Sequence, residues 1–215
     1  MFRGALDESI LKRAQQKKLA SINIHNLRDW TQDRHRTADD RPFGGGAGMV
    51  LKPEPIFKAV ESLRKKNSRV ILLGPAGKRL DHGLVKKLAK RKHLILICGH
   101  YEGIDERVRQ HLADEEISIG DYVLTGGEIP AMVVIDAVVR QLPGVLGHAD
   151  SASDESFADG LLEYPHYTRP AKYRRWSVPK ILLSGNHAAI ETWRREEAKK
   201  ITKKQRPDLF GKLSL

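Results

Sequence analysis

Glycine residues gather in three short segments, each following or adjoining an apolar run. The segments are LGPAG (residues 73–77), GHYEG (residues 99–103) and SIGDYVLTGG (residues 118–127). Taken singly, each segment is explained as well by a turn that caps a helix. Ligands bind beyond the carboxyl ends of strands in open parallel sheets, and glycine leaves room for a flat ligand beside main-chain donors and acceptors. Three such segments together therefore predict a small-molecule pocket.

Carboxylates gather in a second region, residues 147–170, which carries Asp154, Glu155, Asp159 and Glu163. Arg140 ends the apolar segment that precedes it. A carboxylate can act as a general base, and an arginine can stabilise negative charge that develops during a reaction. These residues are candidate catalytic groups, although on local sequence alone an acidic, disordered linker is the favoured alternative.

Two motifs near the N-terminus are weaker. The segment GGGAGM (residues 44–49) lacks both the Lys-Ser/Thr of a phosphate-binding loop and the third glycine of a dinucleotide-binding fingerprint. A tight turn is the better explanation for it. Arg34, Arg36 and Arg41 alternate with carboxylates, and such a cluster is equally compatible with phosphate binding and with an exposed ion-pair network.

Hydrophobic periodicity alternates between helical and strand-like segments over the first two thirds of the chain. We predict helices at residues 5–18, 55–66, 81–91 and 128–141, strands at 21–25, 69–73 and 94–98, and further short apolar runs at 117–119 and 122–124. This order is typical of an α/β fold whose parallel sheet is covered by helices on both faces.

We expect three regions: a domain at residues 1–146, a linker at 147–170 and a small helical domain at 171–215. The composition changes at residue 147 to Asp, Ser, Glu, Gly and Pro, with few aliphatic residues. Within the last region we predict a helix from about residue 187 to 200 and a short helix beginning near residue 206. Trp176 and Trp193 are expected to pack in its core.

The charge of the chain indicates a polyanionic partner. The 215 residues include 38 Lys and Arg against 27 Asp and Glu, which leaves a net charge of +11. The basic residues lie towards both ends and the acidic residues in the middle. Solvent-exposed lysine-rich helices are the alternative explanation.

The same composition favours a cytoplasmic protein. The longest apolar stretch, residues 131–139, is too short to cross a membrane, and residues 1–4 lead into a charged pattern that gives no support for secretion. The single cysteine, Cys98, permits no internal disulfide and is expected to pack in a buried strand without a redox role.

Longer motifs carry a resemblance. Six motifs lie in one order between about residues 33 and 193: DRPFGGGAGM, ICGHYEGIDERV, SIGDYVLTGGE, PGVLGH, SFADGLLEYPHYTRP and LLSGNH. Together they resemble the bacterial tRNA (guanine-N1)-methyltransferases of the trefoil-knot, or SPOUT, superfamily. The resemblance implies a parallel sheet with a deep C-terminal trefoil knot, S-adenosylmethionine as methyl donor, and a homodimer whose active site combines two subunits. It also implies an apolar strand ahead of Met1 that this sequence does not contain, so that a sheet edge and apolar surface would be exposed.

By matched position, the resemblance implies contacts to the donor from the three glycine-containing segments. These residues are Leu73, Gly74, Pro75, Gly99, Tyr101, Glu102, Ser118, Ile119, Gly120, Tyr122, Leu124, Gly126 and Gly127. Gly74 stands where the family often has a hydroxyl residue, so no side chain is expected to contact the donor there.

The resemblance also implies the reaction, methylation of guanine N1 on the 3′ side of the anticodon in tRNA. Because guanine N1 carries a proton at neutral pH, its methylation needs a general base and stabilisation of negative charge on O6. The family commonly places an aspartate directly before Ser-Phe. Here Glu155 holds that position, with Asp154 as the alternative base, while Arg140 would polarise O6 and Glu163 matches a second acidic position. Mg²⁺ is implied by the resemblance as well.

Residues near the C-terminus would contact the tRNA, since they combine ring faces with hydrogen-bond donors. They are His166, Tyr167, Arg169, Ser184, Asn186, His187, Arg194 and Arg195; Lys199 and Lys200 extend the basic helix that we expect to contact the tRNA backbone. Two alternatives remain open at this point: a knotted methyltransferase acting on ribosomal RNA, and an RNA-binding protein without catalysis.

Overall fold

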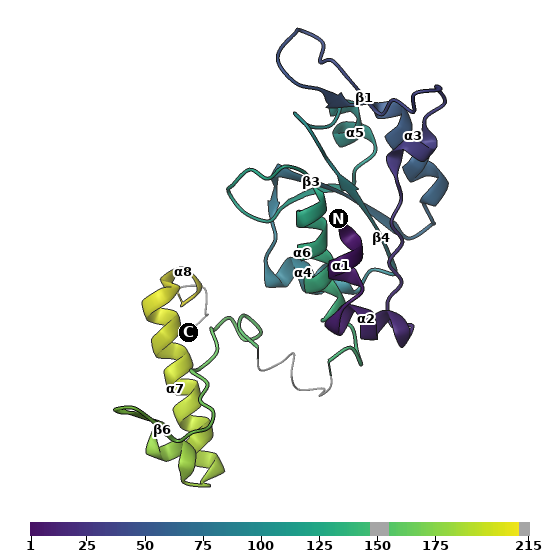
Figure 1. Cartoon of the computed structure of the whole chain (residues 1–215). Coiled ribbons are helices and arrows are strands. Elements are labelled where there is room, and N and C mark those ends of the chain that lie inside the picture. Colours follow the sequence, from purple (N-terminus) through teal and green to yellow (C-terminus); the bar gives the residue numbers. More distant parts are fainter. Residues whose placement is uncertain (147–154, 211–215) are drawn as a thin grey trace. The chain divides into compact units, whose positions relative to one another are not determined.

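A computed structural model describes residues 1–146 and 155–210, with Arg3 described by its backbone alone. The chain divides into two compact units, Met1–Gly147 and His148–Leu215, and each is described by itself (Figure 1).

The first unit is built on a three-stranded parallel sheet in the order β4-β3-β5. The strands are β3 (Ser68–Arg79), β4 (His93–Cys98) and β5 (Glu115–Ser118). The β3–β4 register runs from Ser68↔His93 to Leu73↔Cys98. The predicted α/β class with a parallel sheet is therefore confirmed.

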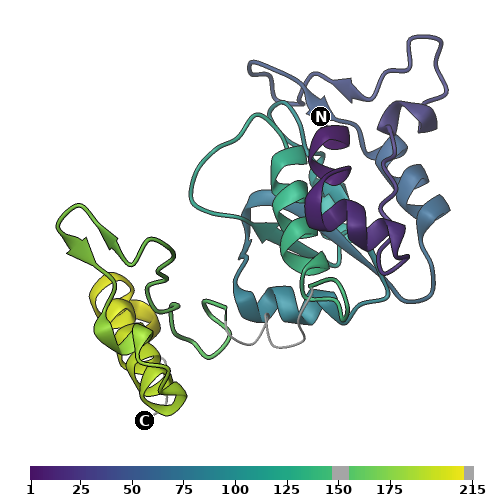
Figure 2. The ribbon, with the colours of Figure 1, turned by 60° about the horizontal axis from the view of Figure 1, so that its bottom comes forward.

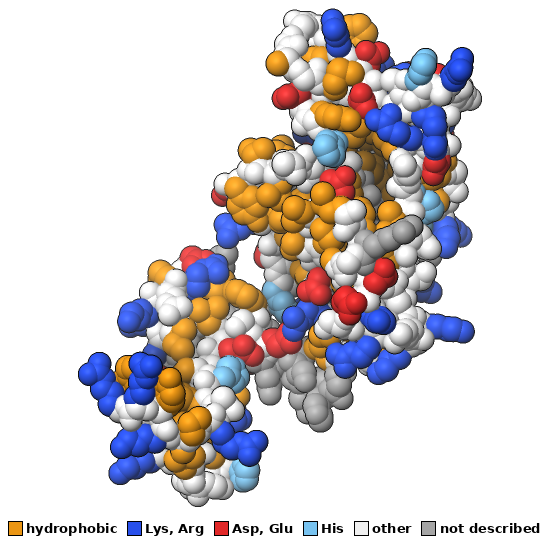
Figure 3. Space-filling view, in the orientation of Figure 1, with side chains coloured by type: hydrophobic (Ala, Val, Ile, Leu, Met, Phe, Trp, Pro, Cys, Tyr) orange, Lys and Arg blue, Asp and Glu red, His pale blue; other side chains and the backbone are white. Residues whose placement is uncertain are grey.

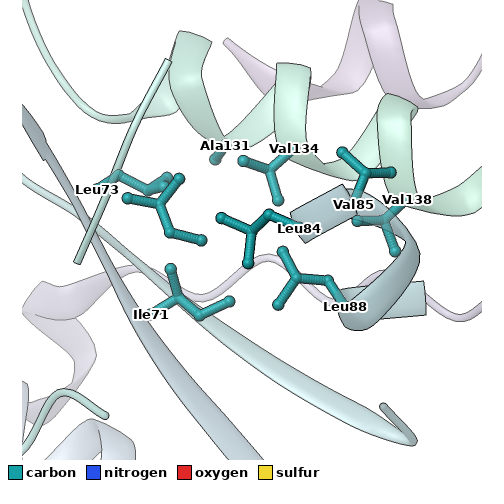
Figure 4. Packing of buried hydrophobic residues seen from close by; sticks show 9 residues of the cluster. Ile71, Leu73, Leu84, Val85, Leu88, Ala131, Val134 and Val138 are labelled. Carbon is teal, nitrogen blue, oxygen red and sulfur yellow. The ribbon is translucent and has the colours of Figure 1, made fainter. Parts of the chain in front are cut away.

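One face of this sheet is covered by helices α4 (His82–Ala89) and α6 (Glu128–Val139). Alternate residues of β3 point to it, as strand geometry requires, and they pack with the two helices as Figure 4 shows. The buried residues of this core are Ile71, Leu73, Leu84, Val85, Leu88, Ile117, Ala131, Val134 and Val138.

Helix α6 is also covered on its outer side, by α1 (Phe2–Leu6) and α2 (Ser9–Gln16), as Figure 2 shows. Leu6, Leu11 and Ala14 pack there against Val139 and Val145. Burial from two sides explains why α6 is apolar around much of its circumference.

The opposite face of the sheet is covered by α3 (Pro53–Leu63) and α5 (Glu106–His111). Its buried residues are Leu51, Ile56, Val60, Val70, Leu72, Ile97, Val108 and Leu112. Beside it lie a short antiparallel pair, β1 (Asp39–Asp40) with β2 (Val50–Leu51), and the 3₁₀ helix η1 (Leu27–Trp30).

Strand β3 contains an irregularity that shapes the site. Leu73 and Lys78 both lie opposite Ile117 of β5, so residues 74–77 leave the ladder between two paired positions. Gly77 packs against the main chain of Glu116 and Ile117 so closely that a Cβ atom would overlap it. Only glycine permits this approach.

The second unit contains a hairpin of β6 (Lys172–Tyr173) and β7 (Trp176–Ser177), the 3₁₀ helix η3 (Lys180–Leu183), and helices α7 (His187–Gln205) and α8 (Pro207–Phe210). Residues 155–163 form turns that are tied to α7. The Leu162 N–H donates to Oγ1 of Thr202 (2.8 Å), and the fully buried Thr202 hydroxyl donates to the Ala198 carbonyl (2.7 Å).

Several local predictions are wrong. The helix expected at residues 5–18 is divided into α1 and α2, and residues 21–25 form no strand, since no strand among the described residues pairs with them. Residues 122–124 are exposed and lie outside the sheet. Trp176 is 56% exposed on the hairpin and does not pack in a core. Helix α5 and the hairpin were not predicted.

Candidate active site

A pocket lies at the carboxyl ends of the three strands, where parallel sheets place their ligands. Its volume is about 450 Å³, and residues 72–76, 99–104, 116–120 and 122–127 line it, with Glu106, Arg109 and Pro130. Residues 74–76 form one wall, because residues 74–77 leave the β3–β5 ladder there.

The structure brings together around this pocket every residue that the sequence predicted as a donor contact. Leu73, Gly74, Pro75, Gly99, Tyr101, Glu102, Ser118, Ile119, Gly120, Tyr122, Leu124, Gly126 and Gly127 all line it. Their contacts with a donor stay a prediction.

Main-chain contacts hold two of the loops together. The Gly127 N–H donates to the Gly99 carbonyl (2.7 Å), and His100 pairs with Gly126 in an isolated bridge. A Cβ atom at Gly127 would lie 2.6 Å from Cα of Cys98 and 2.7 Å from N of Gly99. A side chain at Gly127 would therefore displace the loop before it could obstruct the pocket.

The second loop depends on unusual backbone conformations. Tyr101 has a φ of 59° and Gly103 a φ of 138°, and the Tyr101 N–H donates to Nδ1 of His100 (3.0 Å). The left-handed conformation is costly for tyrosine, and such strain often lies at functional sites. The ring of Tyr101 is half exposed at the pocket.

The glycine-rich segment at residues 44–48 adjoins this second loop. Gly44, Gly45, Gly46 and Gly48 all have positive φ angles, which explains the glycine density as a turn requirement. A Cβ at Gly48 would meet the Glu102 side chain at 2.5 Å. The segment thus supports the pocket wall.

One arginine of the nearby cluster, Arg36, is engaged in a local ion pair, as is the neighbouring Arg28. Arg36 forms an ion pair with Asp29, and Arg28 pairs with Asp39 at 3.2 Å. Of the two interpretations of the sequence, phosphate binding and an ion-pair network, the structure therefore shows the ion pair for Arg36.

Sequence reasoning missed a charged group in the pocket wall. Oε2 of Glu116 lies 3.9 Å from Nη1 of Arg109, and its carboxylate lies over Gly74, where a Cβ atom would overlap it. Burial raises the pKa of Glu116, while Arg109 acts in the opposite direction and Glu106 raises it further. Strand alternation was the available signal, because Glu116 and Ser118 flank the core residue Ile117 and so share the other side of β5.

Cys98 lies behind the pocket in β4. Burial, together with the charge of Glu128, raises the pKa of its thiol to about 12. A thiol with a pKa raised in this way stays protonated at neutral pH, and the absence of a redox role stays a prediction.

The candidate catalytic residues are divided between the two units. Arg140 is the C-cap of α6 in the first unit, whereas Glu155 and Glu163 belong to the second. Oε2 of Glu163 lies 3.8 Å from Nε2 of His166, and the Glu163 N–H donates to Oγ of Ser156 (3.0 Å). Asp154 lies outside the described residues.

Two of the predicted substrate contacts have a structural role. Oγ of Ser184 donates to the Ile181 carbonyl (2.7 Å) and accepts from the Asn186 N–H (3.2 Å). Oδ1 of Asn186 accepts from the Ala189 N–H (3.1 Å) and so caps α7, which begins at His187.

Aromatic and basic side chains meet along α7. The rings of Tyr164 and His166 are 4.7 Å apart, and the Arg194 guanidinium lies 4.8 Å from the Tyr164 ring centre. Tyr167 and Trp193 approach at 6.5 Å. Arg169 and Arg195 are exposed.

The metal implied by the resemblance finds no ready site here. No group of three or more His, Cys, Asp or Glu side chains is placed to hold a metal within residues 1–146 and 155–210.

In the same part of the chain, no helix combines the length and the apolar character needed to cross a membrane.

The fold and pocket define an α/β protein with a cofactor-sized, glycine-lined cavity at the carboxyl edge of a parallel sheet. Residues 1–212 match the family described as "tRNA (Guanine-1)-methyltransferase TrmD". The chain belongs to this tRNA (guanine-1)-methyltransferase family.

Curated relatives agree over nearly the whole chain. The tRNA (guanine-N(1)-)-methyltransferase of Dictyoglomus turgidum is 61% identical over 215 residues, covering 100% of this chain and 87% of that protein. The proteins of the same name from Brevibacillus brevis and Carboxydothermus hydrogenoformans are 58% and 59% identical, covering 100% and 98% of this chain and 89% and 83% of theirs.

Proposed function

We propose that this protein transfers a methyl group from S-adenosylmethionine to N1 of guanine in tRNA, on the 3′ side of the anticodon. The observation that carries the proposal is the pocket: it gathers the residues that matched the family's donor site in a chain that belongs to the family.

The pocket suits this donor in size and charge. Its volume of about 450 Å³ falls within the range of about 300–1,000 Å³ found for small-molecule sites. Glu102 and Glu116 line it, and carboxylates complement a ligand that carries sulfonium and ammonium charges. Gly99 and Gly126 line the pocket beside them and leave space for the donor because neither residue has a side chain.

The chemistry divides between a base and a charge stabiliser. S-Adenosylmethionine, when bound, supplies a sulfonium methyl group to which N1 forms a bond as the carbon–sulfur bond breaks. Glu155 accepts the N1 proton, with Asp154 as the alternative base, and Arg140 stabilises the negative charge that develops on O6. Glu163, held by Ser156 and near His166, supports the base from the same unit.

The proposed enzyme works as a homodimer, in which the pocket of one subunit receives Glu155 from the other. An apolar surface on the first unit supports this. Ile129 and Val133, one turn apart on α6, are 40% and 41% exposed, and Val123 beside the pocket is 90% exposed. Figure 3 shows hydrophobic side chains gathered over α6. A surface of this kind marks an interface.

Two further features belong to the proposal. The chain from β5 through residues 119–127 returns across the end of β4, where Gly127 bonds to Gly99, and we propose that this passage forms the trefoil knot of the family. No step is assigned to Mg²⁺, because the described residues do not form a metal-binding group.

The test is methyl transfer to an unmodified tRNA transcript, followed by mass mapping of the modified nucleoside. N1-methylguanosine 3′ to the anticodon is the expected product, and a transcript with adenosine at that position is the control. A 2′-O-methyl product, or modification of ribosomal RNA alone, would contradict the proposal. Absence of S-adenosylmethionine binding in calorimetry would favour an RNA-binding protein without catalysis.

A further inference from the structure

The hairpin of β6 and β7 presents two large aromatic side chains to solvent. Tyr173 and Trp176 lie directly opposite each other in the ladder, and directly opposed residues share one face of a hairpin. They are 59% and 56% exposed. Together with Tyr167 and Arg169, they line a cavity of about 410 Å³.

Two arginines at the hairpin tip are placed beside these rings. The guanidinium of Arg174 lies 5.3 Å from the centre of the Tyr173 ring, and that of Arg175 lies 5.4 Å from the Trp176 ring. Within about 6 Å, such pairs are attractive and hold both groups in place. The tip therefore combines oriented ring surfaces with positive charge, and Figure 3 shows Lys and Arg side chains around hydrophobic ones there.

The positive charge around the hairpin has no paired carboxylate in the described part of the chain. From residue 164 to residue 190 the chain contains no Asp or Glu. Among the residues that the structure describes, no carboxylate forms an ion pair with Lys172, Arg174 or Arg175. By contrast, Lys199 and Lys200 on α7 pair with Glu196 and Glu197 at 3.0 and 2.7 Å.

The turn itself is strained in a way that folding does not explain. Arg174 has a φ of 54°, a conformation that hairpin turns normally assign to glycine or asparagine. A hairpin with two residues in each strand adds little stability of its own in water. Strain at an exposed position without a packing role points to a binding function.

We propose that the β6–β7 hairpin binds unpaired nucleotides of the tRNA, with Tyr173 and Trp176 stacking on bases and Arg174 and Arg175 contacting the neighbouring phosphates. Aromatic stacking together with a basic surface is the usual way in which proteins hold single-stranded RNA. This inference rests on the proposed function, since it takes tRNA as the substrate, and it adds a surface distinct from the donor pocket and from α7.

The test compares affinity for an unmodified tRNA transcript and for a fully paired RNA duplex. Tyr173→Ala/Trp176→Ala should bind tRNA at least about 5-fold, and up to about 100-fold, more weakly for each base that is no longer stacked. Its affinity for the duplex should change little, because a duplex offers no unpaired base. Tyr173→Phe/Trp176→Phe keeps a ring at both positions and should recover most of the tRNA affinity.

The arginines are tested by salt dependence. Arg174→Gln/Arg175→Gln should reduce the logarithmic salt slope of tRNA binding by about 0.7–0.9 for each phosphate that the variant no longer neutralises, whereas the alanine variant should keep the slope. Donor affinity, measured by calorimetry, reports whether the first unit is folded, and the helical signal in circular dichroism reports whether the second unit keeps α7.

Unchanged tRNA affinity in the alanine variant, or equal reductions for tRNA and duplex, would overturn the inference. So would binding of the wild-type protein to phosphatidylglycerol vesicles that tRNA does not displace and that the alanine variant loses. Failure of the wild-type protein to methylate any tRNA would instead contradict the proposed function.

Discussion

Glu116 places a carboxylate in the pocket wall, where burial raises its pKa even though Arg109 lies 3.9 Å away. The local environment also determines which residue type and which backbone conformation other positions of the site require. Gly127 is required because main chain approaches it closely, and Tyr101 holds a left-handed conformation at the edge of the pocket. The substitutions that test the site must therefore separate chemistry from packing.

For Glu116→Gln we expect a change in how the free energy of unfolding depends on pH. Its raised pKa means that the folded protein binds this proton more tightly than the unfolded chain, so its contribution to stability is lost as pH rises through the ordinary value of 4.5 and the raised value above it. Glu116→Gln should therefore be more stable than the wild type at neutral pH, and the difference should shrink towards pH 4. Thermal unfolding at several pH values measures this.

The neighbouring Glu115 supplies the control. It forms an ion pair with Arg69 at 2.8 Å, so Glu115→Gln should lower stability at neutral pH, by up to about 1 kcal/mol. A Glu116→Gln protein that is less stable than the wild type at neutral pH would show that attraction by Arg109 outweighs burial.

Glu155→Gln should reduce methyl transfer by about 100-fold or more while leaving donor affinity unchanged, because the carboxylate acts on guanine. Single-turnover rates and calorimetry measure the two properties separately. Wild-type rates in this variant, together with an inactive Asp154→Asn protein, would assign the base to Asp154.

Three glycine-containing segments at strand ends predicted the pocket from local sequence, whereas its individual residues were predicted from the family resemblance by matched position. All the predicted donor residues line one cavity. Glu116 was missed because strand alternation indicates only that it shares one side of β5 with Ser118, whereas its burial depends on β5 lying beside β3. Trp176 was assigned to a core on residue type alone, whereas the hairpin leaves it exposed.

At the scale of elements, α7 organises the second unit. Thr202 is fully buried on this helix, and its hydroxyl accepts from Leu162 while it donates to Ala198. This group attaches the segment that contains Glu155 and Glu163 to the helix, and the Arg206 guanidinium at the end of α7 lies 5.9 Å from the centre of the Phe157 ring in the same segment. The position of the proposed base therefore depends on a hydroxyl outside the pocket.

Thr202→Val should destabilise this attachment. Valine keeps the shape of the side chain but leaves the Leu162 N–H without its acceptor, at a cost of about 1–3 kcal/mol. Hydrogen exchange at Leu162 should accelerate, and methyl transfer should fall with donor affinity unchanged.

Thr192 provides a matched comparison on the same helix. Its hydroxyl also donates to a backbone carbonyl one turn earlier, that of Ala188 (3.0 Å), but it is exposed and does not tie the helix to residues 155–163. Thr192→Val should leave exchange at Leu162 unaltered. Equal effects of the two substitutions would mean that the helix alone, and not the bond to Leu162, holds the segment.

Elements with strong periodicity were predicted closely, as in α4 and β4. Short elements, and segments whose alternation is not matched by a neighbouring strand, were not. Residues 21–25 alternate like a strand but pair with no strand in the described part of the chain, and the β6–β7 hairpin has so few residues that periodicity cannot reveal it. Helix α5, only six residues long, escapes prediction for the same reason.

At the scale of the whole molecule, the proposed active site needs two copies of the chain. Mixing Glu155→Gln with Leu124→Trp subunits tests this. Leu124 lines the pocket and is 37% exposed, so tryptophan should obstruct the pocket without entering the core. A hybrid dimer contains one site with an intact pocket and an intact Glu155, and activity should return to a fraction of the wild-type level.

Subunit exchange must be demonstrated independently, for example with differently tagged chains. Inactive mixtures in which exchange has occurred would mean that pocket and base come from the same chain. The sequence could not decide this by itself, because nothing local distinguishes a contact within a chain from one between copies.

Ile117 lies opposite both Leu73 and Lys78 in the ladder. The pocket wall between these two residues can therefore change in length without a change in the register of the sheet. Residues 74–76 could gain one residue while both ends of the excursion keep their partners. The added closure entropy would cost only about 0.2 kcal/mol. Gly77, which touches the main chain of β5, would have to stay. The protein can thus acquire a differently shaped wall, by natural insertion or by engineering, and accommodate altered sulfonium donors without rebuilding its fold.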